Sequence, residues 1–374
     1  MTTAFSAEVL RDSAGLQRIC DLLPRLIAGS ARVSPWQQPE FLSSWWKHIG
    51  ARRSGEASRQ LCLVLVTSHG QPHLAMPLQL SRNRRSGMRW LEPIGMPDDI
   101  HRPRLGIGPL DEGAYRCALQ AIAALRGEWD GIRLDEKAAD DAELHLLQRI
   151  SAELGWRSRR VPLHACPFLD LSSTWDAYWN GRSAKLRKNL GAARRRLEEQ
   201  GKLMLQCFES PQDLQRGFEV LLQVTARSWK REAGLGLGSG EAYQAFYREF
   251  LGRMAAAGRA RIYALFVAGT PVAATLAFLD DPVYYSAQIA HDGAYDAFSP
   301  GTLLESMEMQ ALLTERRFAL YDFLGAALSN KRRWTDTMDS TMRILWLART
   351  PRAWAFDAFY FAIKPRLRAL RRHR

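Results

Sequence analysis

Residues 260–304 read ARIYALFVAGTPVAATLAFLDDPVYYSAQIAHDGAYDAFSPGTLL, and this run sets the fold class. Two apolar segments flank the turn at 268–271, where a glycine and a proline occur, and this pattern is typical of a β-hairpin. A third strand is predicted at 282–289. The Ser-Pro-Gly at 299–301 predicts a helix start, since serine is a good N-cap and proline fits a first-turn position. Hairpin, strand and helix in this order indicate a sheet that helices cover.

Strands and helices alternate along the rest of the chain in a mixed order. Strands are predicted at 61–67, 74–80, 89–94, 105–110, 131–134, 203–208, 320–324 and 342–347. Helices are predicted at 114–125, 141–153, 184–200, 211–229, 243–257 and 301–316, and a glycine-rich loop at 230–240. Because hairpins and crossovers both occur, we expect an α/β fold with mixed sheets and helices on both faces.

The length of 374 residues favours two domains. We expect an N-terminal half at 1–160 and a C-terminal half at 161–348, with the boundary near 157–167. A third segment, 349–374, is predicted to be a basic aromatic helix.

The net charge of +13 is concentrated in two segments. Residues 182–202 carry a net +6 and residues 349–374 a net +7. Charge placed this way indicates an anionic partner: a phosphorylated donor, a nucleic acid or a lipid surface. The alternative is a solvated helix face without a partner. Because 349–374 also has many aromatic residues, it is typical of a helix lying on an anionic membrane, or else of a helix packed on the body.

The five cysteines are widely spaced, and no C-x-x-C occurs, which argues against disulfides and a zinc site. We therefore predict no metal. The first residues lack the apolar core of a signal peptide, and no window has about 18 apolar residues, so we expect a cytoplasmic protein.

Polar residues around the helix start at 299–301 suggest chemistry. The first amides of a helix bind anions, so Ser299, Gly301 and Thr302 are predicted to hold a diphosphate, with Lys331 as a further cofactor-binding residue. The predicted catalytic residues are His291 and Asp292 as bases, Tyr295 as an acid, and Asp322 on the next strand. The alternatives are that His291 and Asp292 are turn residues and that Asp322 forms a structural ion pair with Lys331 or Arg332.

Four segments resemble known proteins. They are residues 34–47 with Trp45-Trp46, the basic run 183–197, the Tyr…Ser-Pro-Gly-x-Leu-Leu of 295–304, and 321–334 with Asp322-Phe323-Leu324. Together they resemble the GNAT superfamily of acyl-CoA-dependent transferases, in the FemAB-like branch annotated around bacterial cellulose and exopolysaccharide synthesis. The resemblance implies two tandem GNAT-like halves and an acyl-CoA donor bound to the second. The chain departs from the usual GNAT pyrophosphate loop at Phe298 and Leu303, and it lacks an acidic pair at 325–328.

The resemblance implies transfer of an acyl group, most simply acetyl from acetyl-CoA, to an amine or hydroxyl of a sugar or cell-envelope precursor. One alternative is a FemAB-like aminoacyl transferase that uses charged tRNA, which the departures in the pyrophosphate loop favour. Nucleic acid is otherwise not an expected partner. The other alternative is a non-catalytic membrane-surface module of a polysaccharide synthesis machine, with contact through 349–374.

Overall fold

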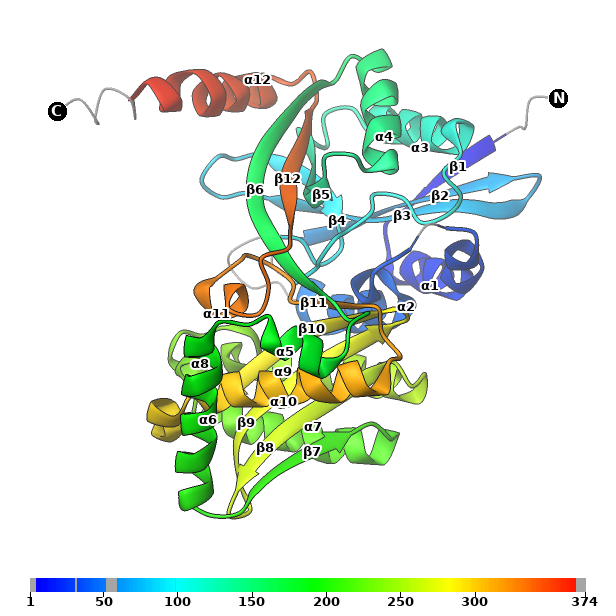
Figure 1. The fold of residues 1–374 in the computed structure, drawn as a ribbon. Helices are drawn as coiled ribbons and strands as arrows, with labels where there is room; N and C mark the ends of the chain where they lie inside the picture. The colour runs from blue at the N-terminus through cyan, green and yellow to red at the C-terminus, as the bar shows by residue number, and fades with distance from the viewer. Residues whose placement is uncertain (1–4, 31, 52–58, 98, 368–374) are drawn as a thin grey trace. The chain divides into compact units, whose positions relative to one another are not determined.

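The computed structural model describes residues 5–30, 32–51, 59–97 and 99–367 (Figure 1). The chain forms two compact units. The first comprises Met1–Leu163 together with Ser340–Arg374, and the second comprises His164–Asp339. Residues 340–374 therefore belong to the first unit, whereas the sequence analysis placed 340–348 in the C-terminal half.

The first unit contains a mixed sheet with the strand order β1-β2-β3-β4-β5-β12-β6. Its strands are β1 (Phe5–Leu10), β2 (Arg59–Ser68), β3 (Gln71–Arg82), β4 (Arg89–Pro93), β5 (Gly131–Ala138), β12 (Met338–Leu347) and the first half of β6 (Arg157–Asp170). Its helices are α1 (Ser13–Ala28), η1 (Pro35–Gln37), α2 (Pro39–Trp45), η2 (Trp46–Gly50), α3 (Glu112–Ala124), α4 (Ala142–Glu153), α12 (Pro351–Asp357) and η5 (Ala358–Ile363).

The second unit contains a mixed sheet with the strand order β6-β11-β10-β9-β8-β7. Besides the second half of β6, its strands are β7 (Leu203–Phe208), β8 (Ala260–Val267), β9 (Thr270–Asp280), β10 (Val283–His291) and β11 (Leu320–Asp322). Its helices are α5 (Trp175–Asn180), α6 (Ala184–Glu199), α7 (Pro211–Ala226), α8 (Trp229–Glu232), η3 (Gly236–Ser239), α9 (Glu241–Ala256), η4 (Gly293–Phe298), α10 (Pro300–Glu315) and α11 (Ser329–Arg332).

The two sheets share one topology. In the first unit β1 to β4 are antiparallel neighbours, β4 pairs with β5 in parallel, and β5 pairs with β12 antiparallel. In the second unit β7 to β10 are antiparallel neighbours, β10 pairs with β11 in parallel, and β11 pairs with β6 antiparallel. The predicted fold class is confirmed: two tandem α/β units with mixed sheets.

Side chains alternate along the strands of the second sheet, so each strand presents residues to both faces. Helices cover both of these faces. Ala277 and Leu279 of β9 share a hydrophobic core with α5, α6 and α10. Phe278 between them packs on Phe250 of α9, with ring centroids 4.4 Å apart. In Figure 1, α10 lies in front of the yellow strands and α7 behind them. The predicted arrangement of helices on both faces is therefore observed in this unit.

The last strands of the two units are exchanged. Thr341–Leu347 of β12 pair with β5, although β6 follows β5 along the chain. Phe168–Asp170 of β6 pair with β11, although β12 follows β11 along the chain. The segment 157–167, where we expected the boundary between the halves, forms most of the 14-residue strand β6, and the division between the two units falls within it, after Leu163.

Local predictions succeeded where turn and cap residues were present. The hairpins β2–β3 and β8–β9 and the basic helix α6 are confirmed. The predicted strand 105–110 is wrong: its only ladder contact is an isolated bridge between Ala75 and Ile107. The helix predicted at 211–229 ends at Ala226. Within the described ranges, no helix combines the length and apolar character that a bilayer span requires.

Candidate functional site

Strands β10 and β11 pair in parallel over a short distance. Their parallel register covers Val283–Tyr285 against Leu320–Asp322. Beyond Tyr285, β10 has a register irregularity against β9 between Ser286 and Gln288 and continues to His291. The parallel pairing therefore ends with β11 at Asp322, whereas β10 continues to His291 beside the start of α10. The carboxyl ends of adjacent parallel strands are where α/β sheets commonly bind ligands.

His291 lies at the end of β10, against the first turn of α10. Its Nε2 is 2.8 Å from Oδ1 of Asp296 in η4. A Cβ added to Gly301 would lie 3.3 Å from Nδ1 of His291. The structure thus brings together two of the predicted site residues, His291 and Gly301, and adds Asp296, which the sequence analysis did not name.

Asp292 and Tyr295 belong to the short η4 segment. The buried Asp292 caps η4, accepting a hydrogen bond from the amide of Ala294 at 2.9 Å, and Arg227 approaches its other oxygen at 3.4 Å. Tyr295 is half-buried against the core of the second unit. The carboxylate of Asp292 therefore has a structural task, and its catalytic role stays a prediction.

Ser299 does not cap α10 as predicted. Its backbone is left-handed, with φ of 50° and ψ of 50°, and its side chain makes no cap hydrogen bond. The amides of Thr302 and Leu303 instead donate to the carbonyl of Ser299, at 3.1 and 3.2 Å. A diphosphate bound at this helix start must share or displace these two hydrogen bonds. Pro300 occupies the first turn as expected.

Thr302 is tied to the segment after β11. Arg333 donates from Nη1 to Oγ1 of Thr302 at 2.8 Å. The neighbouring Trp334 is fully buried and donates from Nε1 to Glu305 of α10 at 3.0 Å. The carbonyl of Trp334 accepts from Tyr178 at 2.9 Å and from Arg182 at 2.8 Å. Arg333 and Trp334 therefore hold the loop after β11 on the start of α10.

Asp322 and Lys331 both bind the backbone of Leu324. Asp322, buried at the end of β11, accepts from the amide of Leu324 at 2.9 Å. Lys331 donates from Nζ to the carbonyl of Leu324 at 2.5 Å. Leu324 has a φ of 54°, so these bonds fix a backbone conformation that leucine rarely adopts. A direct ion pair between Asp322 and Lys331 or Arg332 stays a prediction.

Lys230 adds a second ammonium near Lys331. Burial and, to a smaller extent, the positive charge of Lys331 together lower the pKa of Lys230 to about 8. The segment that carries Lys230 lies against β10, since a Cβ at Gly236 would be 3.1 Å from Oε1 of Gln288. Gln288 in turn donates to the hydroxyl of Tyr247 at 2.9 Å. Two neighbouring ammonium groups favour an anionic ligand near the end of β10.

Two buried glutamates lie on α10, one and two turns after Gly301. Burial raises the pKa of Glu305 to about 7, against the hydrogen bond from Trp334. Burial raises the pKa of Glu308 to about 8, against the hydrogen bond from the hydroxyl of Tyr284. The core below the start of α10 therefore holds carboxyl groups that titrate near neutral pH.

The basic helix α6 runs beside the site and contacts both α10 and η4. The guanidinium carbon of Arg196 lies 5.8 Å from the ring centroid of Phe298, the residue that precedes Ser299. Lys185, Lys188, Arg194 and Arg195 are exposed on this helix. The positive charge of α6 thus lies next to the predicted diphosphate site.

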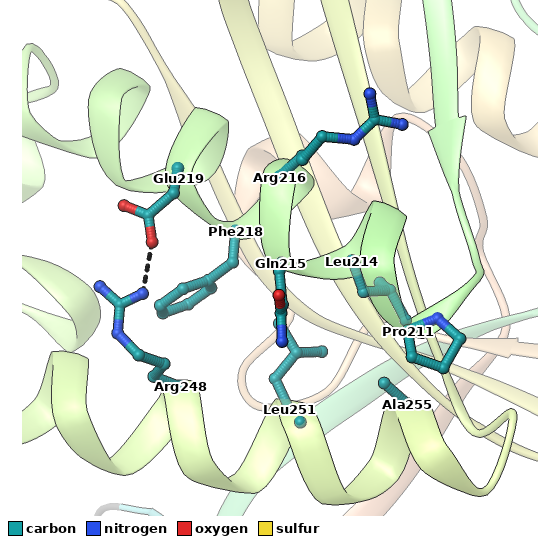
Figure 2. A pocket seen from close by; sticks show the side chains of 10 residues that line it. Pro211, Leu214, Gln215, Arg216, Phe218, Glu219, Arg248, Leu251 and Ala255 are labelled. Atoms are coloured by element: carbon teal, nitrogen blue, oxygen red, sulfur yellow. Dashed lines mark hydrogen bonds and ion pairs between the residues drawn. The ribbon is translucent and has the colours of Figure 1, made fainter.

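A groove of about 420 Å³ lies elsewhere in the second unit, between α7 and α9 (Figure 2). Leu214, Phe218 and Leu251 line it, and an ion pair between Glu219 and Arg248 crosses one end. None of the predicted site residues lines it.

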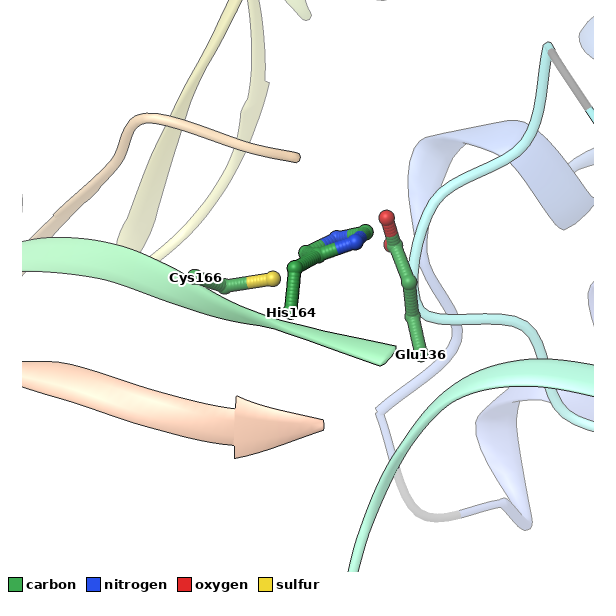
Figure 3. Close-up of side chains that lie close together, drawn as sticks. All are labelled: Glu136, His164 and Cys166. Carbon is green, nitrogen blue, oxygen red and sulfur yellow. The ribbon is translucent and has the colours of Figure 1, made fainter. Parts of the chain in front are cut away.

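His164 and Cys166 lie two residues apart on β6 and project from the same face of that strand (Figure 3). Cys166 is buried. Glu136, also labelled in Figure 3, belongs to the first unit, where its carboxylate accepts from the amide of Arg102 at 3.0 Å. The absence of a bound metal stays a prediction.

The sequence analysis missed Glu305, Glu308, Lys230, Arg333 and Trp334. The two glutamates had a signal: they follow Gly301 by four and seven residues, so all three share one face of α10. Lys230 had no local signal, because only tertiary packing brings it near Lys331.

Comparisons with known proteins concern the domain and the fold. Residues 184–332 match the model of the acetyltransferase (GNAT) domain. A crystal structure of FemX superposes with a TM-score of 0.59 at 10% identity, covering 94% of this chain and 99% of that chain. A conserved protein of unknown function from Bacteroides thetaiotaomicron gives a TM-score of 0.54 at 9% identity, and the match covers 91% of this chain and 100% of that chain.

The C-terminal domain of a putative lysylphosphatidylglycerol synthetase from Agrobacterium fabrum gives a TM-score of 0.52 at 14% identity, covering 92% of this chain and 95% of that chain. No curated protein matches the chain. At these identities the likenesses concern the fold alone. Residues 184–332 of the second unit thus match a GNAT-type acetyltransferase domain, and the chain as a whole has the fold of the FemX structure.

Proposed function

We propose that the protein is an acyltransferase whose second unit binds acyl-CoA, most simply acetyl-CoA, and transfers the acyl group to an amine or hydroxyl. The observation that carries this proposal is the closeness of His291, at the end of β10, to Gly301 in the first turn of α10. It joins a titratable side chain to a helix start inside the segment that matches the GNAT domain.

The donor diphosphate is assigned to the start of α10. Ser299, Gly301 and Thr302 supply backbone and hydroxyl groups there, and Arg333 adds a cation through its hydrogen bond to Thr302. The positive end of the helix dipole favours an anion at this position. Lys331, near Lys230, is placed to hold a further negative charge of the donor or the acceptor.

His291 is assigned as the general base that takes the proton of the acceptor. Asp296 holds its Nε2, so the imidazole presents Nδ1 toward Gly301. An imidazole with one nitrogen held by a carboxylate can accept a proton at the other nitrogen, which here faces the donor site. Tyr295 remains the proposed acid, while Asp292 and Asp322 are assigned to shaping the loops on either side.

The acceptor is proposed to be a sugar or cell-envelope precursor, which the sequence resemblance implies. The link to cellulose or exopolysaccharide synthesis rests on that resemblance alone. An anionic acceptor is favoured by the pair of ammonium groups at Lys230 and Lys331.

Transfer of an aminoacyl group from charged tRNA is the second candidate. The basic helix α6 favours it, because exposed Lys185, Lys188 and Arg195 lie on a helix that contacts η4 and α10. Such a row of cations binds a phosphate backbone with strong salt dependence.

Calorimetry separates the two candidates. The acyl-CoA proposal predicts that acetyl-CoA binds the full chain and that Gly301→Val abolishes the heat. Gly252→Ala in α9, where a new Cβ meets nothing within 4 Å, is the matched control and should bind normally. Binding of charged tRNA without any heat from acetyl-CoA would favour the second candidate and reject the first.

A further inference from the structure

The C-terminal helix of the first unit presents an apolar face to solvent. On α12, η5 and the turn that follows, four large apolar side chains are exposed: Trp354 (56%), Phe359 (46%), Ile363 (48%) and Leu367 (49%). Exposed apolar side chains scattered singly are ordinary, but four on one continuous helical segment form a patch.

The opposite face of this helix is fixed to the first unit. Asp357 is buried and accepts hydrogen bonds from Arg159 at 2.6 and 2.8 Å and from Arg157. Phe356 packs on Trp90 with ring centroids 5.3 Å apart, and Ala353 is buried in the same small core. The helix is therefore held in one orientation, with Phe359, Ile363 and Leu367 exposed on it. Trp354 is exposed at its side, where the guanidinium carbon of Arg157 lies 4.0 Å from the ring centroid.

Cations surround the apolar face. Arg349, Arg352 and Arg366 are exposed, and Lys364 lies over the ring of Tyr360 at 4.6 Å. Asp357 is the one acidic residue of 349–374, and Arg157 and Arg159 bind it. The basic residues after Leu367 lie outside the described residues. An outward apolar stripe flanked by positive charge matches the boundary of an anionic lipid surface, where alkyl and aromatic groups enter the acyl region and cations meet headgroups.

We propose that Trp354, Phe359, Ile363 and Leu367 dock this protein onto a membrane of anionic phospholipid. The occupant is the lipid surface itself rather than a protein groove, since charge complementarity requires a partner rich in negative charge. The inference does not depend on the donor that the second unit binds.

The test is vesicle flotation of the full chain. Vesicles of phosphatidylcholine are compared with vesicles containing equal parts of phosphatidylcholine and phosphatidylglycerol. We expect the chain to float with the anionic vesicles and to remain in solution with the neutral ones, and added salt should weaken flotation.

Two double substitutions distinguish docking through the apolar face from nonspecific attraction of a basic protein to anionic vesicles. Phe359→Ser with Ile363→Ser should lower the partition coefficient between vesicles and solution by about tenfold or more, because two apolar side chains that enter the bilayer on binding are lost. Leu110→Ser, an equally exposed leucine (45%) of the same unit, is the control and should leave it unchanged. In the charge comparison, Arg352→Gln with Arg366→Gln should weaken flotation more than Lys185→Gln with Arg195→Gln in α6.

Three outcomes would overturn the proposal. The first is equal flotation of the Phe359/Ile363 variant and the unaltered chain. The second is a concentration-dependent dimer in sedimentation that the same variant abolishes, which would make the face a contact between copies. The third is RNA binding lost in the Arg352/Arg366 variant without any flotation of the unaltered chain.

Discussion

The imidazole of His291 lies so close to the first turn of α10 that a Cβ on Gly301 would be 3.3 Å from its Nδ1. A side chain at Gly301 must therefore push the imidazole away. The new Cβ of Gly301→Ala would displace the imidazole by a few tenths of an ångström, and the branched side chain of Gly301→Val would displace it further. We predict that Gly301→Ala lowers the rate of acyl transfer severalfold and that Gly301→Val lowers it by up to about a hundredfold, the loss expected when a reacting group is misplaced by about 1 Å. Steady-state kinetics with acetyl-CoA checks this prediction.

The folded state of the Gly301 variants needs its own control. Neither variant should shift the thermal unfolding midpoint by more than Gly252→Ala does, because Gly301 lies in a helix without a left-handed backbone. Unchanged rates in Gly301→Val would show that the imidazole has no part in the reaction.

Glu308 makes stability depend on pH. Its pKa is raised by burial to about 8 in the folded protein, from the ordinary glutamate value of 4.5. A raised carboxyl pKa adds stability that is complete below the unfolded pKa and disappears as the pH rises through the folded pKa. We therefore predict that the free energy of unfolding falls between about pH 5 and pH 8, with a slope of up to about 1.4 kcal/mol per pH unit for this carboxyl.

Glu308→Gln should flatten this pH dependence, because an amide does not ionise and its oxygen still accepts from Tyr284. Glu199→Gln, an exposed residue of α6, is the matched control and should leave the slope unchanged. Urea unfolding at several pH values measures both. A slope that Glu308→Gln leaves intact would exclude this carboxyl as its source.

Trp334 joins the loop after β11 to α10 through Glu305. Trp334→Phe removes the indole N–H that donates to Glu305 and leaves that buried carboxyl without this bond. We predict a loss of about 1–3 kcal/mol in the free energy of unfolding, as for other buried polar groups that lose a partner. Trp229→Phe, at a tryptophan that is 56% exposed, should cost much less. Equal losses in the two variants would contradict the structural task given to Trp334.

Lys230 should react faster than other lysines. With a pKa of about 8, about half of its side chain is uncharged at pH 8, compared with under about 1% of an ordinary lysine. We predict that an acylating reagent labels Lys230 first at pH 8, as mass spectrometry of digested protein would show. Lys331→Gln removes a neighbouring positive charge, so it should raise the pKa of Lys230 and slow its labelling. If Lys331→Gln left the labelling rate of Lys230 unchanged, the charge of Lys331 would have no influence on the pKa of Lys230.

Much of the fold could be predicted because its signals are local. The hairpin β8–β9 has its turn residues at 268–271, and the caps Thr174 and Ser183 mark two helix starts. Segment 105–110 is apolar but forms only a bridge, since strand formation depends on a partner along its whole length. The pairing of β12 with β5 joins residues about 200 positions apart, and no local pattern identifies such a partner.

The site was predicted in part for the same reason. His291 and Gly301 both follow from the strand end and the helix start, and they lie together in the structure. Ser299 was given a cap role that its left-handed backbone prevents. Glu305 and Glu308 were passed over, because charged residues on a helix are usually exposed and only the packing of α10 on the sheet buries them.

The exchange of last strands has a consequence for synthesis of the protein on the ribosome. Strand β12 lies between β5 and β6 in the first sheet, yet its residues are 338–347. The sheet of the N-terminal unit is therefore incomplete when residues 1–163 have been synthesised, because β12 is still missing. It must wait, with an edge of β5 unpaired, until translation of the whole second unit is complete, and this makes the nascent chain a natural client for chaperones that shield open strand edges.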